Sequence, residues 1–223
     1  MASARKIAEA IIDEAGVPPS TINSISRRLA EDGIIPRGSR GHAVKNLSPM
    51  DCSNLLLGAL ALADSYGTVS NRIGRRVKEI GGLRFSGGLS AARDNKSAKL
   101  DCALEVFSSG ETFAATIAGL MAKATTAKLR PRLPQIIRKI GVTLQGESVG
   151  GWIEFSKGLE ISRGSDEKID GCVTNHEATL RGERLTVMRG QKTAMARETY
   201  FEWDAIQRIA ELGAKDNPDW SVR

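Results

Sequence analysis

Apolar residues recur at every third or fourth position over most of the first 140 residues, and at every second position in several segments after that point. The first spacing is typical of helices that bury one side, and the second is typical of strands that bury one face. We therefore expect an α+β fold, with an all-helical N-terminal half followed by a small β-rich C-terminal domain with one closing helix.

Glycines and capping residues mark the ends of the expected helices. Gly16 and Gly33 should end the first two helices, because glycine readily adopts the left-handed conformation that follows a helix. Ser48 and Asp51 form a capping signal for the third helix, and Glu111 is expected to support a cap at 108–109. The periodicity predicts helices over about residues 4–15, 18–32, 48–63, 70–80, 98–107, 110–127, 134–139 and 204–213.

A change of pattern divides the chain into three expected parts. Residues 84–97 are rich in glycine, serine and charge, which is typical of a linker or loop. After about residue 140, alternating segments joined by glycines predict strands and turns. We expect a helical domain over 1–83, a linker and helical oligomerisation segment over 84–139, and a β-rich domain over 140–223.

The second expected helix has two chemically different sides. Ile22, Ile25 and Leu29 share one side, and the polar residues between them point away from it. Among those polar residues, Asn23 can pair with adenine and Arg27 with guanine, and serine can bond either a base or a phosphate. This pattern predicts a helix that enters a groove of DNA.

The stretch GVPPSTINSISRRL (16–29) resembles the turn and recognition helix of many bacterial helix-turn-helix regulators. The continuation AEDGIIPRG (30–38) is similar to winged helix-turn-helix proteins, including the MerR-like group. The resemblance covers about residues 5–45 and implies that 1–83 is a winged helix-turn-helix domain with supporting helices. It further implies that the glycine-flanked arginines after the helix lie in a wing. The predicted DNA-binding residues are Ser20, Thr21, Asn23, Ser24, Arg27, Arg28, Arg37, Ser39, Arg40, His42 and Lys45.

The charge of the chain is unevenly distributed. Of the net +6, residues 1–146 contribute +9 and residues 147–223 contribute −3. This asymmetry favours a polyanionic partner for the N-terminal part. We expect the basic segments 72–78 and 128–139 to be solvated surfaces rather than further phosphate contacts. RNA is disfavoured because the basic part has few aromatic residues on which bases could stack.

Other kinds of chemistry find little support in the sequence. The three cysteines are far apart, which indicates neither a disulfide framework nor a metal site. His42 and His176 have no spacing typical of a catalytic or metal site, and no phosphate-binding loop is present. We therefore expect no enzymatic activity, no cofactor and no metal. The aromatic residues Trp152, Phe155, Tyr200 and Trp203 are expected to form core rather than a ligand pocket.

The sequence also predicts where in the cell the protein is found. Acidic residues within the first helix exclude a secretory signal. The apolar run at 55–63 is too short to span a bilayer. A cytoplasmic protein without membrane contact is expected.

The hypothesis is a sequence-specific regulator of transcription that binds double-stranded DNA, and its organisation is similar to prophage or mobile-element proteins. A homo-oligomer is expected, with a dimer favoured, because such modules commonly bind paired half-sites. An activator would also contact RNA polymerase or another protein. Two alternatives stay open: the DNA-recognition component of a phage packaging complex, and a protein–protein adaptor.

Overall fold

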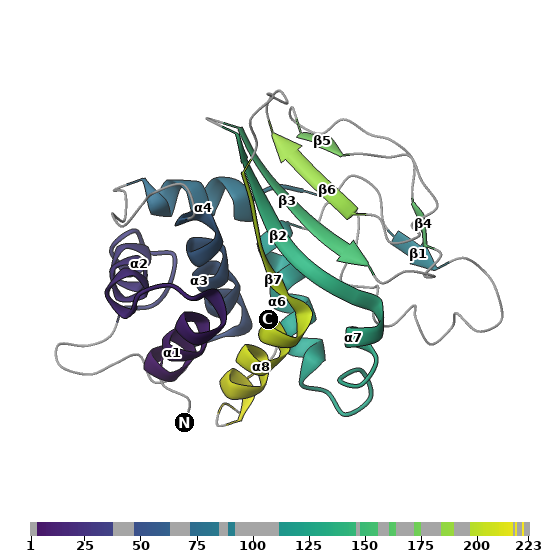
Figure 1. Cartoon of the computed structure of the whole chain (residues 1–223), viewed down its shortest axis with the longest axis horizontal. Coiled ribbons are helices and arrows are strands. Elements are labelled where there is room, and N and C mark those ends of the chain that lie inside the picture. Colours follow the sequence, from purple (N-terminus) through teal and green to yellow (C-terminus); the bar gives the residue numbers. More distant parts are fainter. Residues whose placement is uncertain are drawn as a thin grey trace.

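The computed structural model describes residues 4–37, 47–62, 72–84, 89–91, 112–145, 148–155, 161–163, 172–174, 184–189, 197–215, 217 and 220. Most of the described helices lie against one face of an antiparallel sheet (Figure 1). This mixture of helix and sheet confirms the expected α+β class. The helices are α1 (Ala4–Ala15), α2 (Pro19–Glu31), α3 (Pro49–Ala61), α4 (Ile73–Gly81), α6 (Phe113–Ala124), α7 (Leu133–Ile136) and α8 (Trp203–Ala214).

Most helix ends follow from local chemistry. Gly16 and Gly33 have φ angles of 61° and 67°, the left-handed conformation expected after α1 and α2. At the start of α3, the Asp51 amide donates to Ser48 Oγ at 3.1 Å, and the Ser48 amide donates to Asp51 Oδ2 at 2.9 Å. The predicted capping box is therefore confirmed.

The start of α6 differs from the prediction. The helix begins at Phe113, and Thr112 is its N-cap, because Thr112 Oγ1 accepts from the Ala115 amide at 3.2 Å. The cap predicted at 108–109 with Glu111 is therefore wrong. Those residues, the helix predicted over 98–107 and His176 lie outside the described residues.

Among the described residues, five strands form the main sheet, in the order β5-β6-β3-β2-β7. Strand β3 pairs with β2 on one side and with β6 on the other, and β2 also pairs with β7. Both β2 and β3 therefore lie inside the sheet. The strands are β2 (Ile137–Gln145), β3 (Ser148–Phe155), β5 (Cys172–Thr174), β6 (Arg184–Arg189) and β7 (Arg197–Glu202), and a separate pair consists of β1 (Leu89–Ala91) and β4 (Ile161–Arg163).

Long-range pairing corrects two local predictions. The short helix predicted over 134–139 ends at Ile136, because residues from Ile137 onward pair with β3 and β7. The segment predicted as a linker, 84–97, contains strand β1, which pairs antiparallel with β4. Strand β7 is distant in sequence from β2, and β4 is distant from β1, so local composition carried no signal for these two pairings.

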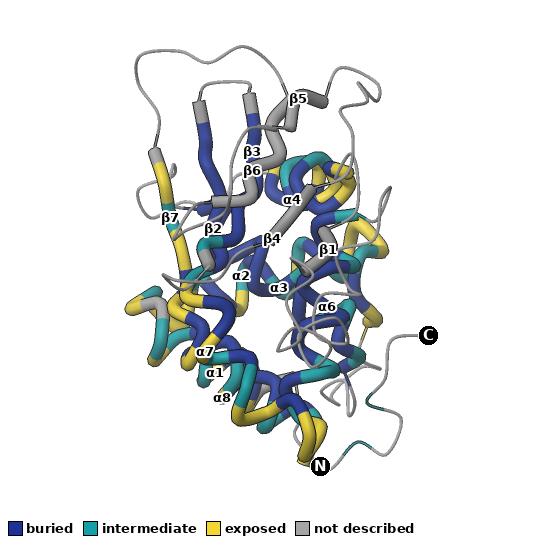
Figure 2. Tube along the Cα trace, turned by 90° about the vertical axis from the view of Figure 1, so that its right-hand side faces the viewer, coloured by how far each residue is buried: buried dark blue, intermediate teal, exposed yellow. Residues whose placement is uncertain are grey.

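The two faces of the sheet carry different residues. Ile140, Val142 and Ile153 are buried on the side that the helices cover, and Gly151 on this side lies against the ring of Phe113 in α6. Figure 2 shows buried residues running from β2 and β3 into the helices beneath them. Because neighbouring residues of a strand point to opposite faces, Trp152 lies on the other face from Gly151.

The four aromatic residues expected in the core differ in where they lie. Trp203 belongs to the core, and Trp152 is buried on the outer face of the sheet. Tyr200, in contrast, is 47% exposed, so its placement in the core is wrong. Its ring centroid lies 6.0 Å from that of Trp152, and Lys139 Nζ lies 4.1 Å from the Tyr200 centroid. The side chain of Phe155 lies outside the described part of the structure.

Buried residues from all three predicted parts of the chain belong to one hydrophobic cluster, which extends from Ile7 to Ala210. In particular, α8 packs against α1 (Figure 1). Arg208 of α8 also donates two hydrogen bonds to the carboxylate of Glu14, at 2.6 and 2.7 Å. This hydrogen bonding raises the pKa of Arg208. The division of the chain into domains at 83/84 and 139/140 stays a prediction.

Cys52, at the start of α3, provides a probe of unfolding. Its side chain is fully buried, and burial, with a smaller contribution from Asp51, raises the pKa of its thiol far above the usual range. Because only the thiolate reacts rapidly, we expect Cys52 in a C102S/C172S variant to resist a thiol reagent at pH 8 until the protein unfolds. Ellman's reagent with and without urea checks this. Rapid reaction in native buffer would contradict it.

Candidate nucleic-acid interface

One side of α2 is fixed firmly to the helices beneath it. Ile22, Ile25 and Leu29 are fully buried, as their spacing predicted. At Gly58 of α3 the backbone approaches this side so closely that a Cβ there would lie 2.7 Å from Ile25 Cγ2 and 3.3 Å from Leu29 Cδ1. The absence of a side chain at Gly58 therefore allows α2 to pack closely on α3.

The connection from α1 to α2 is short. Gly16 ends α1 in the left-handed conformation, and Pro19 is the first residue of α2. Proline suits this position because its missing N–H would have no partner inside the helix. The Thr21 amide then donates to the Pro18 carbonyl at 2.9 Å. The turn between the two helices is therefore tight, and the burial of Ile22, Ile25 and Leu29 leaves the other side of α2 at the surface.

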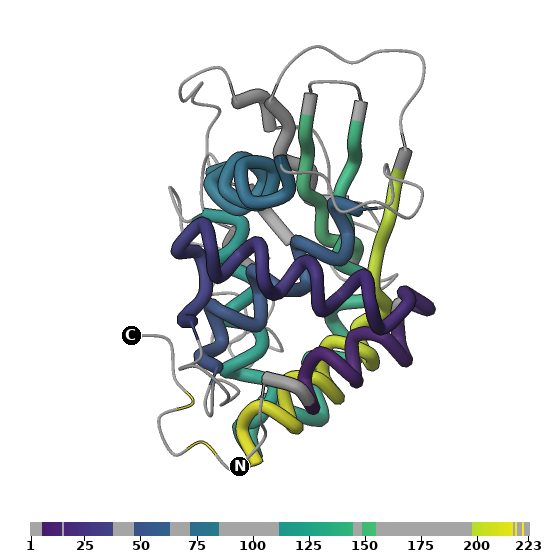
Figure 3. Tube along the Cα trace, turned by 90° about the vertical axis from the view of Figure 1, so that its left-hand side faces the viewer, coloured from purple at the N-terminus to yellow at the C-terminus, as the bar shows by residue number. Residues whose placement is uncertain are grey.

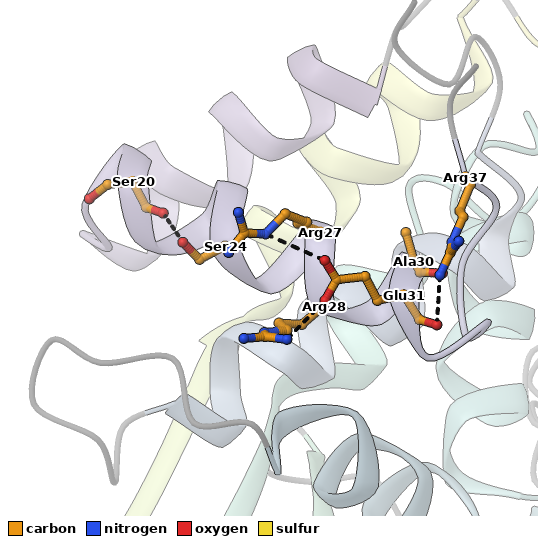
Figure 4. A network of polar contacts seen from close by, with 7 residues as sticks. All are labelled: Ser20, Ser24, Arg27, Arg28, Ala30, Glu31 and Arg37. Carbon is orange, nitrogen blue, oxygen red and sulfur yellow. Dashed lines mark hydrogen bonds and ion pairs between the residues drawn. The ribbon is translucent and has the colours of Figure 1, made fainter. Parts of the chain in front are cut away.

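The residues predicted to contact DNA from α2 share its outer side. Ser20, Asn23 and Arg27 are exposed, whereas Thr21, Ser24 and Arg28 are half-buried. The hydroxyl of Ser24 donates to the Ser20 carbonyl at 2.8 Å, so its proton is used within the helix (Figure 4). Asn23 and Arg27 are four residues apart and lie about 6 Å apart along the helix axis. These two side chains have the chemistry and exposure for base contacts.

Glu31 holds both arginines of α2, and this arrangement was not predicted. Arg28 Nη1 donates to Glu31 Oε2 at 2.9 Å, and Arg27 Nε lies 3.7 Å from Glu31 Oε1 (Figure 4). The three side chains are 37%, 68% and 42% exposed, in the order Arg28, Arg27, Glu31. Spacings of three and four residues bring side chains together on a helix, so this spacing was a usable signal.

Arg37, predicted to contact DNA from the wing, binds the end of α2 in the structure. Its Nε donates to the Ala30 carbonyl and its Nη2 to the Glu31 carbonyl, both at 3.0 Å (Figure 4). The last carbonyls of a helix have no partner within it and carry partial negative charge, which favours a guanidinium there. A DNA contact by Arg37 stays a prediction.

The wing itself is not shown. The described residues that follow α2, 32–37, form no strand. The amides of Ile34 and Ile35 both donate to the Leu29 carbonyl, at 2.8 and 3.4 Å. These bonds close the end of the helix. The predicted wing residues Ser39, Arg40, His42 and Lys45 lie outside the described residues. A winged arrangement therefore stays a prediction.

In the described part of the chain, no three His, Cys, Asp or Glu residues are grouped so that they could hold a metal ion. Among the same residues, no helix has the length and apolar character needed to cross a membrane.

Comparison with protein-family models, with curated proteins and with solved structures found no match to this chain.

Proposed function

We propose that the protein binds double-stranded DNA through α2 and acts as a sequence-specific regulator of transcription. The observation that carries the proposal is the contrast between the two sides of this helix. Its apolar side is completely buried, while Asn23 and Arg27 on its outer side are exposed. A helix that is fixed by its buried side and presents an amide and a guanidinium suits the donor and acceptor pattern of the major groove.

Binding would require Arg27 to leave Glu31. An ion pair between exposed side chains contributes at most about 1 kcal/mol, so its loss costs little. A bidentate contact to guanine contributes about 1–3 kcal/mol of discrimination between bases. For Arg27, exchanging the ion pair with Glu31 for a contact to a base is therefore favourable. Arg28 is closer to Glu31 and half-buried, and we assign it to the phosphate backbone.

Regulation would require more than one copy of the chain. A single helix in the groove buries little DNA surface, so a monomer would bind weakly. We propose a homodimer that binds two half-sites about one helical turn apart. A repressor could act by covering a promoter, whereas an activator would also contact RNA polymerase or another protein.

The first test is selection of bound fragments from genomic DNA by the purified full-length chain at physiological salt. We expect recovery of a short repeated site, whose spacing gives the geometry of the dimer. Recovery of no fragments, with no salt-sensitive binding, would overturn DNA binding and favour a protein–protein adaptor. Uniform recovery of all fragments would overturn sequence specificity and favour an assembly role on DNA.

The residue-level test replaces Arg27 with alanine. On the selected site we expect a loss of about 1–3 kcal/mol of binding free energy, about 5- to 150-fold in Kd, together with relaxed preference at one base pair. Arg138→Ala is the matched control, because Arg138 on β2 is also exposed (56%) and lies 3.5 Å from a carboxylate oxygen, that of Glu154. Fluorescence anisotropy on the selected and single-substituted duplexes measures both variants.

Glu31→Gln refines this test, because it removes the carboxylate that competes for both arginines. We expect this variant to bind DNA at least as tightly as the parent. If Arg27→Ala and Arg138→Ala bind every duplex equally well, the assignment of α2 to the groove is wrong.

A further inference from the structure

Helix α4 presents a second basic surface. Ile73, Val77 and Ile80 are buried and fix one side of the helix. Arg75 and Lys78 are exposed on its other side. Over residues 72–81 the sequence has four basic residues and one acidic residue, Glu79. Basic residues therefore outnumber acidic ones in this segment, and Arg75 and Lys78 among them are exposed.

This basic surface is joined to the end of α2. Lys78 Nζ donates to the Asp32 carbonyl at 3.4 Å, and the side chain of Asp32 occupies the space where Gly74 has no Cβ. Figure 3 shows α4 nearly end-on beside the bluer, C-terminal end of α2. The two helices are thus held in a fixed relation and share one side of the molecule.

Basic residues outnumber acidic ones in the sequence of the joined surface. Residues 27–32 and 72–81 together contain six basic and three acidic residues. Lys78 bonds a neutral carbonyl, which leaves its own charge uncompensated by that contact. The exposed Arg75 lies 3.6 Å from Glu79, a pair that water screens. A partner with regularly spaced negative charges would be attracted to this surface.

In the other basic segment, 128–139, three cations have acidic partners on other elements of the chain. Arg130 Nε lies 2.7 Å from Glu211 Oε1, and Arg138 and Lys139 lie 3.5 and 3.2 Å from Glu154 and Glu202 respectively. The Glu202 contact is also the main cause of a raised pKa at Lys139. These cations bind acids of the same chain, as expected for a solvated surface.

We propose that α4 binds the phosphate backbone of the same DNA whose groove receives α2, with Arg75 and Lys78 as the contacting residues. This inference rests on the proposed function and adds a second contact surface to it. Phosphate contacts position a protein on the duplex but carry no sequence information directly. In this arrangement α4 sets the orientation of α2, and α2 reads the bases.

The test compares R75Q/K78Q with K128Q/R130Q in the full-length chain. Each variant removes two positive charges from exposed positions, so the net charge of the two proteins is the same. Circular dichroism and Tm confirm that both are folded. Anisotropy on the selected duplex and on a scrambled duplex, between 50 and 200 mM salt, gives the slope of log K against log salt.

For R75Q/K78Q we expect the magnitude of this slope to fall by about two, because each lost phosphate contact removes about 0.9. Binding should weaken by a similar factor on both duplexes. K128Q/R130Q should keep the slope of the parent. If the two variants have equal slopes and the parent binds DNA, the proposed role of α4 is overturned and the proposed function is not. A parent that binds neither duplex at any salt concentration would overturn the proposed function as well.

Discussion

Replacing Phe113 with alanine is expected to lower the free energy of unfolding by about 3–5 kcal/mol. The ring is fully buried at the first residue of α6, and it lies directly on the backbone of β3. A Cβ at Gly151 would lie 2.5–2.7 Å from three carbons of this ring. Removing the ring would therefore leave a cavity between the helices and the sheet. Urea unfolding followed by circular dichroism measures the loss.

Phe113→Leu is the matched variant, because it retains most of the apolar volume, and it should lose less than half as much stability. Gly151→Ala should cost about 1–3 kcal/mol by overpacking against the ring. Its cost should fall when Phe113 is already alanine, since residues in contact are coupled in a double-mutant cycle. Independent, additive effects at the two positions would refute this contact.

Replacing Leu29 with alanine is expected to lower the free energy of unfolding by about 2–5 kcal/mol. Leu29 is fully buried beneath α2, in the close contact that Gly58 of α3 allows. The same residue precedes the helix end, where its carbonyl accepts from Ile34. Its loss should loosen α2 at the end that carries Arg27 and Arg28. The same urea titration applies, with the reactivity of Cys52 as a second probe.

Asn23→Ala is the control for this substitution, because Asn23 is on the exposed side of the same helix. Its effect on stability should stay within about 0.5 kcal/mol, as is usual at the surface. A loss below about 1 kcal/mol for Leu29→Ala would mean that α2 does not depend on its buried side, and the basis of the proposed interface would then be removed.

Where the fold depends on local signals, the sequence was sufficient. The start of α2 is marked by Gly16 and Pro19, and its end by Gly33. Its buried side was identified from the spacing of Ile22, Ile25 and Leu29. The capping box at the start of α3 was equally readable, because its two partners are three residues apart. In each case the interacting residues are neighbours in the chain, so that propensity and periodicity contain the information.

Where partners are distant, the sequence was insufficient. No local pattern indicates that β2 lies between β3 and β7, or that β1 pairs with β4. Tyr200 and Trp152 both occur in strands with alternating residues, yet one is exposed and the other buried. Both residues pair with Gly141 and so lie on the same face of the sheet, but Trp152 is on the inner strand β3 and Tyr200 is on the edge strand β7, a difference set by pairing between distant parts of the chain.

The candidate site was partly accessible from the sequence. The outer side of α2 was identified correctly as exposed or half-buried. The partners of its arginines were missed, although Glu31 stands at the right spacing. The position of Arg37 could not be foreseen, since its hydrogen bonds reach back six and seven residues to backbone carbonyls.

The packing of α8 on α1 has a consequence for how the chain acquires its binding helix. Glu14 and Arg208, which meet across this contact, are 194 positions apart. At a synthesis rate of about 5–20 residues per second, roughly 10–40 s separate their appearance from the ribosome. During that interval α1 has its contacts with α2 and α3 but not with α8, so the support of α2 is incomplete. Grafting residues 1–45 onto another protein would therefore transfer the helix-turn-helix pattern without the scaffold that gives it a shape.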